Sequence, residues 1–191
     1  MEKFKKGAVL ITGTTSGVGL NTLKPLIELG WEIIAVNRSS KRAIDEANKI
    51  LKNDEIESIN FVEIDLSDLN SVRNGSKEII SRFRNNLKVI ICNAAVYKPR
   101  LKRPDRSPQG FENSMAVNHF GHFLLINLLL DNILNSDEKI ILNGEISKFI
   151  PRITILGTVT ANNLELGGKI PIPAPANLGD LSGFEHGFLS P

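Results

Sequence analysis

Cysteine is almost absent from this chain: among 191 residues, only Cys92 is present. A single cysteine excludes an internal disulfide framework and suits a reducing compartment. Charge of one sign is lacking too, because 23 Lys and Arg residues against 21 Asp and Glu residues leave a net charge of +2. This balance gives none of the basic excess that is typical of nucleic-acid-binding proteins.

Long hydrophobic runs are missing as well. The longest, FLLINLLL at 123–130, is interrupted by Asn127, and it falls far short of the roughly 20 apolar residues that a membrane-spanning helix needs. The apolar run at 8–11, after the basic start MEKFKK, is too short for the core of a signal peptide. The sequence therefore predicts neither a membrane span nor secretion, and it leaves association with a membrane surface open.

The sequence does contain an alternation of short apolar runs and longer helical periods over a length that suits a single domain, 1–191. Five β-branched runs with little polar alternation are predicted as strands, at 8–12, 32–36, 60–64, 87–92 and 152–156. Helices are predicted between them, at 17–29, 40–52, 68–85 and 109–135. This order predicts right-handed crossovers and a doubly wound α/β fold with a parallel sheet.

Four local features qualify this pattern. Ser67 and Asp68 are candidate N-caps for the third helix, and Pro25 predicts a kink in the first helix. The Asn-Gly pair at 143–144, between two apolar stretches, predicts a small hairpin. Residues 157–191 are rich in Gly and Pro and show no sustained period, so we interpret them as a loop segment.

A glycine-rich turn, TGTTSGVG at 12–19, follows the first predicted strand. Glycines at a strand-to-helix turn let the backbone approach a pyrophosphate, which the N-terminus of the following helix then stabilises. The spacing is T-G-x-x-x-G-x-G rather than G-x-G-x-x-G. The alternative interpretation is a tight turn with no ligand.

The end of the second predicted strand favours NADPH over NADH. An NAD-binding protein usually has an acid here for the ribose 2′-hydroxyl, whereas this chain has Asn37 and Arg38. A charge-assisted hydrogen bond from a guanidinium to the 2′-phosphate is worth roughly 1.5–3 kcal/mol. The alternative is that Arg38 is only a solvated surface charge.

Further candidates follow the third and fourth strands. Asp65, next to Leu66, is placed either to hold an adenine amine or to cap the next helix. The small residues at 93–95 would let a flat ligand lie close to the sheet edge. Asn118, which we expect to be buried in the long helix, needs a partner for its amide: functional water or backbone, or a local kink.

These residues, in this order, resemble the short-chain dehydrogenase/reductase family, whose fold is of the Rossmann type. The motifs that carry the resemblance are TGTTSGVG, the Asn-Arg pair at 37–38, Asp65-Leu66, CNAA at 92–95 and NHFG at 118–121. Within that family, the chain is most similar to the light-dependent protochlorophyllide oxidoreductases, on the segments 92–99, 110–130, 155–162 and 176–184. The similarity extends over nearly the whole chain except 137–151.

The resemblance implies an NADPH-dependent enzyme of chlorophyll biosynthesis, which reduces a pyrrole-ring double bond of protochlorophyllide to give chlorophyllide after the pigment absorbs light. It implies catalytic roles for Asn118, near a proton-relay water, and for Thr158, which stands where the wider family has a serine. The implied cofactor-binding residues are Thr12, Gly13, Thr14, Ser16, Gly17, Val18, Gly19, Arg38, Asp65, Leu66, Asn93, Ala94 and Ala95.

The family's Tyr-x-x-x-Lys pair is missing. The only tyrosine is Tyr97, and Leu101 stands four residues later. A phenol with a pKa near 10 needs a nearby cation to act as an acid at neutral pH. We therefore expect an incomplete Rossmann domain without its C-terminal strands, an exposed edge on the fifth strand, NADPH binding and no turnover by this chain alone.

The remaining candidates have simple alternatives. Tyr97, on the loop after the fourth strand, is placed for pigment contact or for surface packing. The basic loop at 98–106 is either solvated or attracted to pigment carboxylates and anionic lipids. His119 and His122 lack a third ligand, so we expect packing and no metal site. Cys92 is predicted to be a small buried hydrophobe.

Two other functions are compatible with the same residues. The chain would be another NADPH-dependent short-chain reductase acting on a different ring system, or a non-catalytic module that binds NADPH or pigment. The absence of a transit segment leads us to expect a cytoplasmic product of the cyanobacterial type, with association at the thylakoid surface left open.

Overall fold

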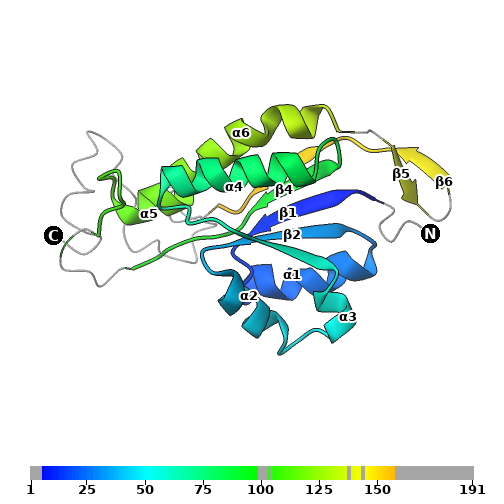
Figure 1. The fold of residues 1–191 in the computed structure, drawn as a ribbon, viewed down its shortest axis with the longest axis horizontal. Helices are drawn as coiled ribbons and strands as arrows, with labels where there is room; N and C mark the ends of the chain where they lie inside the picture. The colour runs from blue at the N-terminus through cyan, green and yellow to red at the C-terminus, as the bar shows by residue number, and fades with distance from the viewer. Residues whose placement is uncertain (1–5, 99–102, 104, 137–138, 143–144, 158–191) are drawn as a thin grey trace, which may run out of the picture.

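A parallel sheet organises the fold of the computed structural model, which describes residues 6–98, 103, 105–136, 139–142 and 145–157. Within these residues the sheet has five strands in the order β3-β2-β1-β4-β7, and each neighbouring pair is parallel (Figure 1). The strands are β1 (Ala8–Thr12), β2 (Glu32–Asn37), β3 (Ile59–Glu63), β4 (Leu87–Cys92) and β7 (Arg152–Ile155). The predicted doubly wound α/β fold is confirmed.

Helices cover both faces of this sheet. Figure 1 shows α1, α2 and α3 on one side and α4 and α6 on the other. Their bounds are α1 (Gly17–Glu28), α2 (Ser40–Ala47), α3 (Asn53–Ile56), α4 (Leu69–Arg82), α5 (Asn113–Met115) and α6 (His122–Leu134), with a π-helical turn η1 (Ala116–Gly121) between the last two.

The strands lack polar alternation because both of their faces are buried. In β1, Leu10 packs with residues of α4 and α6, whereas Val9 and Ile11 pack with residues of α1 on the other side. Residues of β2 divide between the same two clusters, with Ile34 in the first and Ile33 in the second. The core thus consists of two apolar layers that share one sheet.

Two of the predicted helices differ from the observed ones. The helix predicted at 40–52 ends at Ala47 as α2, and a separate short helix, α3, begins only at Asn53, where the backbone N–H of Lys52 donates to the Glu55 side chain. The segment predicted at 109–135 becomes helical only at Asn113, since Gly110 has a φ of +84° that no helix contains. It then passes through η1 before regular α-helix begins.

The local features are largely as expected. Asp68 caps α4 by accepting from the N–H of Asn70, and α1 continues through Pro25 to Glu28, so the kink itself stays a prediction. Strands β5 (Lys139–Leu142) and β6 (Glu145–Lys148) pair antiparallel with Leu142 opposite Glu145, which confirms the hairpin. Residues 143–144 and 158–191, with nearly all of the predicted loop segment, lie outside the described residues.

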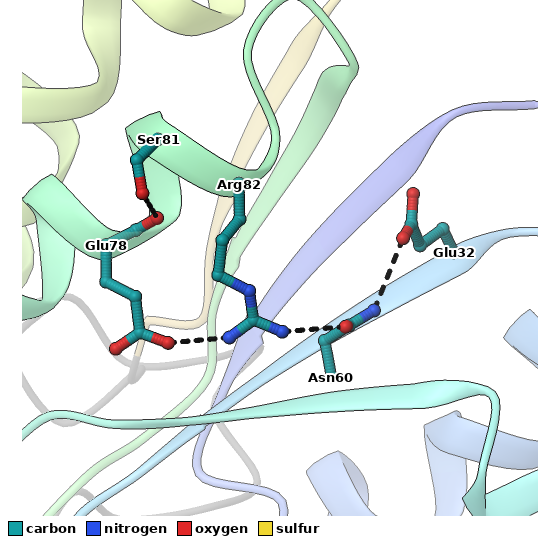
Figure 2. A network of polar contacts seen from close by, with 5 residues as sticks. All are labelled: Glu32, Asn60, Glu78, Ser81 and Arg82. Carbon is teal, nitrogen blue, oxygen red and sulfur yellow. Dashed lines mark hydrogen bonds and ion pairs between the residues drawn. The ribbon is translucent and has the colours of Figure 1, made fainter.

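A polar network fastens the amino-terminal edge of the sheet (Figure 2). The Glu32 carboxylate of β2 accepts from the amides of Asn60 in β3 and of Asn86 just before β4. Arg82 of α4 donates to Asn60 at 2.8 Å and pairs with Glu78 at 2.6 Å. All of these contacts lie at the amino ends of the strands, away from the carboxyl ends.

At the other end of the strand order, β7 is the edge strand of the described sheet. All four of its residues are exposed, including Ile153 and Ile155. No helix in the described ranges is both long and apolar enough to cross a membrane.

Replacing Gly121 with alanine tests how closely the long helix approaches the loop after β3. A Cβ at Gly121 would overlap the carbonyl oxygen of Leu66, which is backbone and cannot move alone. Alanine normally stabilises a helix relative to glycine by about 1 kcal/mol. We expect the overlap to reverse the sign, so that Gly121→Ala lowers the free energy of unfolding by about 1–3 kcal/mol in urea denaturation.

The control is Asn127→Ala, at an exposed position of the following helix α6, where we expect a change within about 0.5 kcal/mol. A Gly121→Ala chain as stable as the parent would contradict the observed packing.

Candidate functional site

A cavity of about 400 Å³ opens at the carboxyl edge of the sheet. It lies where the strand order reverses, with β2 on one side of β1 and β4 on the other. In open α/β sheets this switch point is where ligands bind. Among the residues predicted for the cofactor, those that line the cavity are Gly13, Ser16, Val18, Arg38, Asp65, Leu66, Asn93, Ala94 and Ala95.

The other predicted residues lie elsewhere. Thr12 and Thr14, which belong to the glycine-rich turn, are fully buried and do not line the cavity. Gly17 and Gly19 belong to the first turn of α1. Thr158 lies outside the described residues.

The glycine-rich turn needs its glycines for two reasons. Gly13 and Gly17 have φ values of +73° and +56°, in the left-handed region. Space is also lacking: a Cβ on Gly13 would lie 2.8 Å from the Cα of Ala94, and one on Gly19 would overlap the carbonyl oxygen of Gly13. The turn therefore rests directly against the chain that leaves β4.

The N-terminus of α1 faces this turn without a side-chain cap. Ser16 is the N-cap residue, yet its side chain makes no capping hydrogen bond. The first N–H groups of a helix have no partner within the helix, and together with the helix dipole they attract anions. Since Ser16 and Val18 line the cavity, this end of α1 is suited to a phosphate.

Asn37 locks the turn from the β2 side, and the sequence analysis did not identify that role. Its Oδ1 accepts from the N–H of Thr14 at 2.7 Å, and its Nδ2 donates to the Thr14 hydroxyl at 2.8 Å. The side chain is only 4% exposed. A polar residue that ends an otherwise apolar strand was the available signal.

Asn93 locks the turn from the β4 side. Its Nδ2 donates to the carbonyl oxygens of Thr12 and Gly13, both at 2.9 Å. The backbone N–H groups of Asn93 and Ala94 both donate to the Thr12 hydroxyl. Asn93 thus shapes the cavity by holding the turn.

Two arginines border the cavity near the end of β2. The guanidinium groups of Arg38 and Arg42 are exposed and make no hydrogen bond or ion pair with the described residues. Ser39, between them, caps α2 by accepting from the N–H of Arg42. Arg42 was missed by the sequence analysis, although its position in the first turn after β2, near Arg38, was a usable signal.

Asp65 does not cap the next helix, whose N-cap is Asp68, and its contact with an adenine stays a prediction. Its Oδ1 accepts from the N–H and the hydroxyl of Ser67 at 2.9 and 2.7 Å, which caps the turn before α4. The same residue lines the cavity, and its Oδ2 makes no hydrogen bond with the part of the chain that the structure describes. One carboxylate oxygen is therefore left for a donor in the cavity.

The expectation that Asn118 is buried was wrong. It lies in the π-helical turn η1 and is exposed. Its Oδ1 accepts from the N–H of Val96 at 2.7 Å, and its Nδ2 donates to the Val96 carbonyl oxygen at 2.9 Å. Because η1 interrupts the α-helical register, this side chain turns toward the loop after β4 rather than into the core.

The two histidines have different surroundings. His122 is buried, with Nε2 2.9 Å from the Thr12 hydroxyl oxygen, and burial lowers its pKa. His119 is exposed and stacks on Phe123. No cluster of three His, Cys, Asp or Glu residues in the described ranges could hold a metal ion.

Three further predictions concern the surroundings of the cavity. Cys92 is buried, as predicted, and burial raises the pKa of its thiol to about 11. Tyr97 is 72% exposed, so contact with a pigment stays a prediction. In the basic loop, Lys98 pairs with Asp105 at 2.7 Å; residues 99–102 and 104 lie outside the described residues.

Comparisons with known proteins agree with this geometry. Residues 7–144 match the family model described as short chain dehydrogenase. The chain is 38% identical over 187 residues to the chloroplastic protochlorophyllide reductase of Chlamydomonas reinhardtii, covering 96% of this chain and 43% of that protein. It is 41% identical over 191 residues to the chloroplastic protochlorophyllide reductase of Daucus carota, again covering 96% of this chain and 43% of the relative.

Solved structures show the same fold. An uncharacterized protein from Mycobacterium paratuberculosis is 31% identical with a TM-score of 0.55, covering 68% of this chain and 44% of that one. An apo SCOR enzyme from Clostridium thermocellum has a TM-score of 0.60 at 16% identity, covering 85% of this chain and 58% of that one. The chain spans less than half the length of the curated relatives just described.

Replacing Asn37 with alanine tests the lock on the turn. The substitution leaves the N–H and the hydroxyl of Thr14 buried without their partner. A buried group that loses its partner costs about 1–3 kcal/mol. We expect Asn37→Ala to lower the free energy of unfolding by that amount in urea denaturation.

The control is Asn70→Ala, at an exposed position whose side chain makes no hydrogen bond with the described residues. We expect that variant to be within about 0.5 kcal/mol of the parent. Equal stability of the two variants would show that the Asn37 contacts contribute nothing.

Proposed function

Because the chain belongs to the short-chain dehydrogenase family, we propose that it forms the nucleotide-binding part of a light-dependent protochlorophyllide reductase that uses NADPH. One observation carries the proposal. The cavity at the strand switch point combines an uncapped helix N-terminus with two unpaired arginines, and no carboxylate stands at the end of β2. The named relatives support the substrate class.

The residues present fit a dinucleotide. Side chains at Gly13 and Gly19 would collide with Ala94 and with the Gly13 carbonyl oxygen, so only glycines let the turn lie this close to the chain after β4. The surface of the turn is completed by Ser16, Gly17 and Val18 at the start of α1, whose N–H groups would hold the pyrophosphate. When bound, NADPH supplies a hydride.

Arg38 and Arg42 would hold the 2′-phosphate. Both guanidinium groups border the cavity and are free to donate among the described residues. Guanidinium groups bind phosphate through paired N–H donors. Asn37, where an NAD-binding protein would have an acid, is neutral and committed to Thr14, so the last residue of β2 adds no charge that would repel a dianion. The Glu63 carboxylate of the neighbouring strand accepts from the N–H of Ser40.

Asp65 and Leu66 would flank the adenine, with the free Oδ2 of Asp65 accepting from the exocyclic amine. The backbone from Asn93 to Ala95 would line the ribose next to the nicotinamide. These three residues line the cavity, and their small size keeps that wall flat.

For proton transfer, we propose that Asn118 holds a water molecule. Each of its amide atoms makes one hydrogen bond to Val96, which leaves one N–H and one lone pair for a water molecule. Thr158 is proposed to act where the wider family uses a serine, and Tyr97 to contact the pigment. A location in the cytoplasm and at the thylakoid surface belongs to the same proposal.

A second candidate function is a module that binds the nucleotide without catalysis. The observation in its favour is the cavity itself, whose lining residues all come from this chain. A third, another short-chain reductase acting on a different ring system, shares the cofactor and differs in its substrate.

The preference for NADPH is tested by titration against NADH. We expect the chain to bind NADPH about tenfold to a hundredfold more tightly, because a charge-assisted hydrogen bond is worth roughly 1.5–3 kcal/mol. Arg38→Asp should abolish this preference, and Arg42→Ala should reduce it. Isothermal titration or quenching of protein fluorescence gives both constants.

Arg73→Asp is the matched control, since Arg73 is an exposed arginine of α4 and does not line the cavity. It should leave the preference unchanged. Equal affinities of the parent chain for the two nucleotides would remove the cofactor assignment.

The reaction is tested with protochlorophyllide and NADPH under illumination and in darkness, with chlorophyllide detected by its absorption. Since the tyrosine and lysine pair is missing from these 191 residues, we expect no chlorophyllide from this chain alone. Photoreduction by the chain would show that its own residues suffice for protonation. Reduction of another ring compound in darkness would favour the third candidate.

A further inference from the structure

The Thr12 hydroxyl is a junction between three parts of the fold. It is fully buried at the end of β1. Its oxygen accepts from the backbone N–H groups of Asn93 at 3.0 Å and of Ala94 at 2.9 Å, just after β4. The same oxygen lies 2.9 Å from Nε2 of His122, the first residue of α6, which is only 4% exposed.

The donors and acceptors around this junction can be assigned. A hydroxyl has one O–H donor and two lone pairs, and the two backbone N–H groups occupy both lone pairs of Thr12. The O–H must therefore donate to Nε2 of His122. Because Nδ1 of the ring lies 3.4 Å from the carbonyl oxygen of Asn118, which can only accept, Nδ1 carries the proton.

Only a neutral imidazole satisfies both contacts. Protonation would add an N–H at Nε2 that points at an oxygen with no lone pair left, so the hydroxyl would have to release the N–H of Asn93 or of Ala94. Burial lowers the pKa of His122 in the same direction.

His122 also closes a ring of hydrogen bonds around one wall of the cavity. The ring runs from Thr12 to Asn93 and Ala94, along the chain to Val96, across to the amide of Asn118, and back through its carbonyl to His122. Asn93 through Val96 all line the cavity. The imidazole thus connects the two points at which this wall is fastened.

We propose that His122 is a positioning residue for the nucleotide site: its neutral imidazole holds the Thr12 hydroxyl so that the wall from Asn93 to Val96 keeps its shape. The residue touches no ligand position and acts through Thr12 and Asn118. This inference rests on the proposed function for nucleotide affinity, whereas its effect on the wall is independent of any ligand.

Among the described residues, the His122 imidazole has hydrogen-bond contacts with Thr12 and Asn118 alone, and neither of these groups titrates. In β4, the Cys92 thiol has a pKa of about 11, and the Lys88 amine lies near the amino end of the strand, where it donates to the Lys139 carbonyl. His119 of η1 is exposed, as are the charged side chains of α4 that follow its N-cap, among them Arg73, Lys77 and Glu78.

The sign of the pH effect follows from the direction of the shift. The folded pKa lies below the unfolded value of about 6.5, so the neutral form contributes fully above that value. Its contribution decreases as the pH falls below about 6.5 toward the lower folded pKa, and it stays constant below that.

The test compares His122→Phe, which removes the acceptor, with His122→Gln, whose Oε1 can accept from the Thr12 hydroxyl and does not titrate. NADP⁺ is the probe because it tolerates acid. At pH 8 we expect His122→Phe to bind NADP⁺ about threefold to tenfold more weakly and His122→Gln to stay within about twofold of the parent. Below pH 6.5 the parent should lose affinity for NADP⁺ relative to His122→Gln. The ratio of the two affinities is the quantity compared, because titration of the nucleotide phosphate affects both chains equally.

The matched control is His119→Gln, an exposed histidine one turn away, which should follow the parent at every pH. Parental affinity and pH profile in His122→Phe would overturn the proposal. If His122→Phe does not fold, the ratio of the NADP⁺ affinities of the parent and of His122→Gln is the test. A ratio that does not change with pH overturns the proposal.

A measurement without ligand separates this inference from the proposed function. Hydrogen-exchange protection of the Asn93 and Ala94 amides should fall about threefold to tenfold in His122→Phe, and in the parent below pH 6.5. Unchanged protection refutes the role of His122. Reduced protection without NADP⁺ binding by any chain supports the role of His122 and refutes the nucleotide assignment.

Discussion

The close approach of the glycine-rich turn to the chain leaving β4 is the constraint on which the rest of the site depends. Gly13 has no Cβ, so the turn rests on Ala94, and the Asn93 amide bridges two carbonyl oxygens of the turn. At a switch point the flanking crossovers run in opposite directions and leave a crevice. These contacts join the two walls of the crevice next to the buried Thr12 hydroxyl, which accepts from the same stretch of chain.

The two edges of the sheet are fastened by different chemistry. At the amino edge, Glu32, Asn60 and Arg82 form a partly exposed network in which the ion pair of Arg82 with Glu78 is accessible to water. Such pairs contribute little individually. At the carboxyl edge, the contacts of Thr12 and Asn37 are buried, where an unmet hydrogen bond costs more. The hydrogen bonds that are most costly to break therefore lie next to the cavity.

Much of the fold could be predicted from the sequence because its determinants are local. Apolar runs such as 8–12 indicate strands buried on both faces, and the Asn-Gly pair at 143–144 separates two paired strands. The residues that line the cavity follow strands, so their shared location at one edge was predictable too. What could not be predicted are contacts between distant residues: Thr12 and His122 are 110 positions apart. The π-helical turn that exposes Asn118 has no recognised local signal either.

The groups that give the cavity its charge differ from the groups that give it its shape. The polar groups that shape the cavity are mutually satisfied, so this wall needs no ligand to form, and a preformed site loses little conformational entropy when it binds. Arg38 and Arg42 border the cavity and make no hydrogen bond or ion pair with the described residues. A dianionic phosphate would give their guanidinium groups a partner of opposite charge, whereas a neutral hydroxyl would not. Under the proposed function, discrimination between the two nucleotides would depend on the exposed arginines, whereas the shape of the cavity depends on the buried amides and hydroxyls.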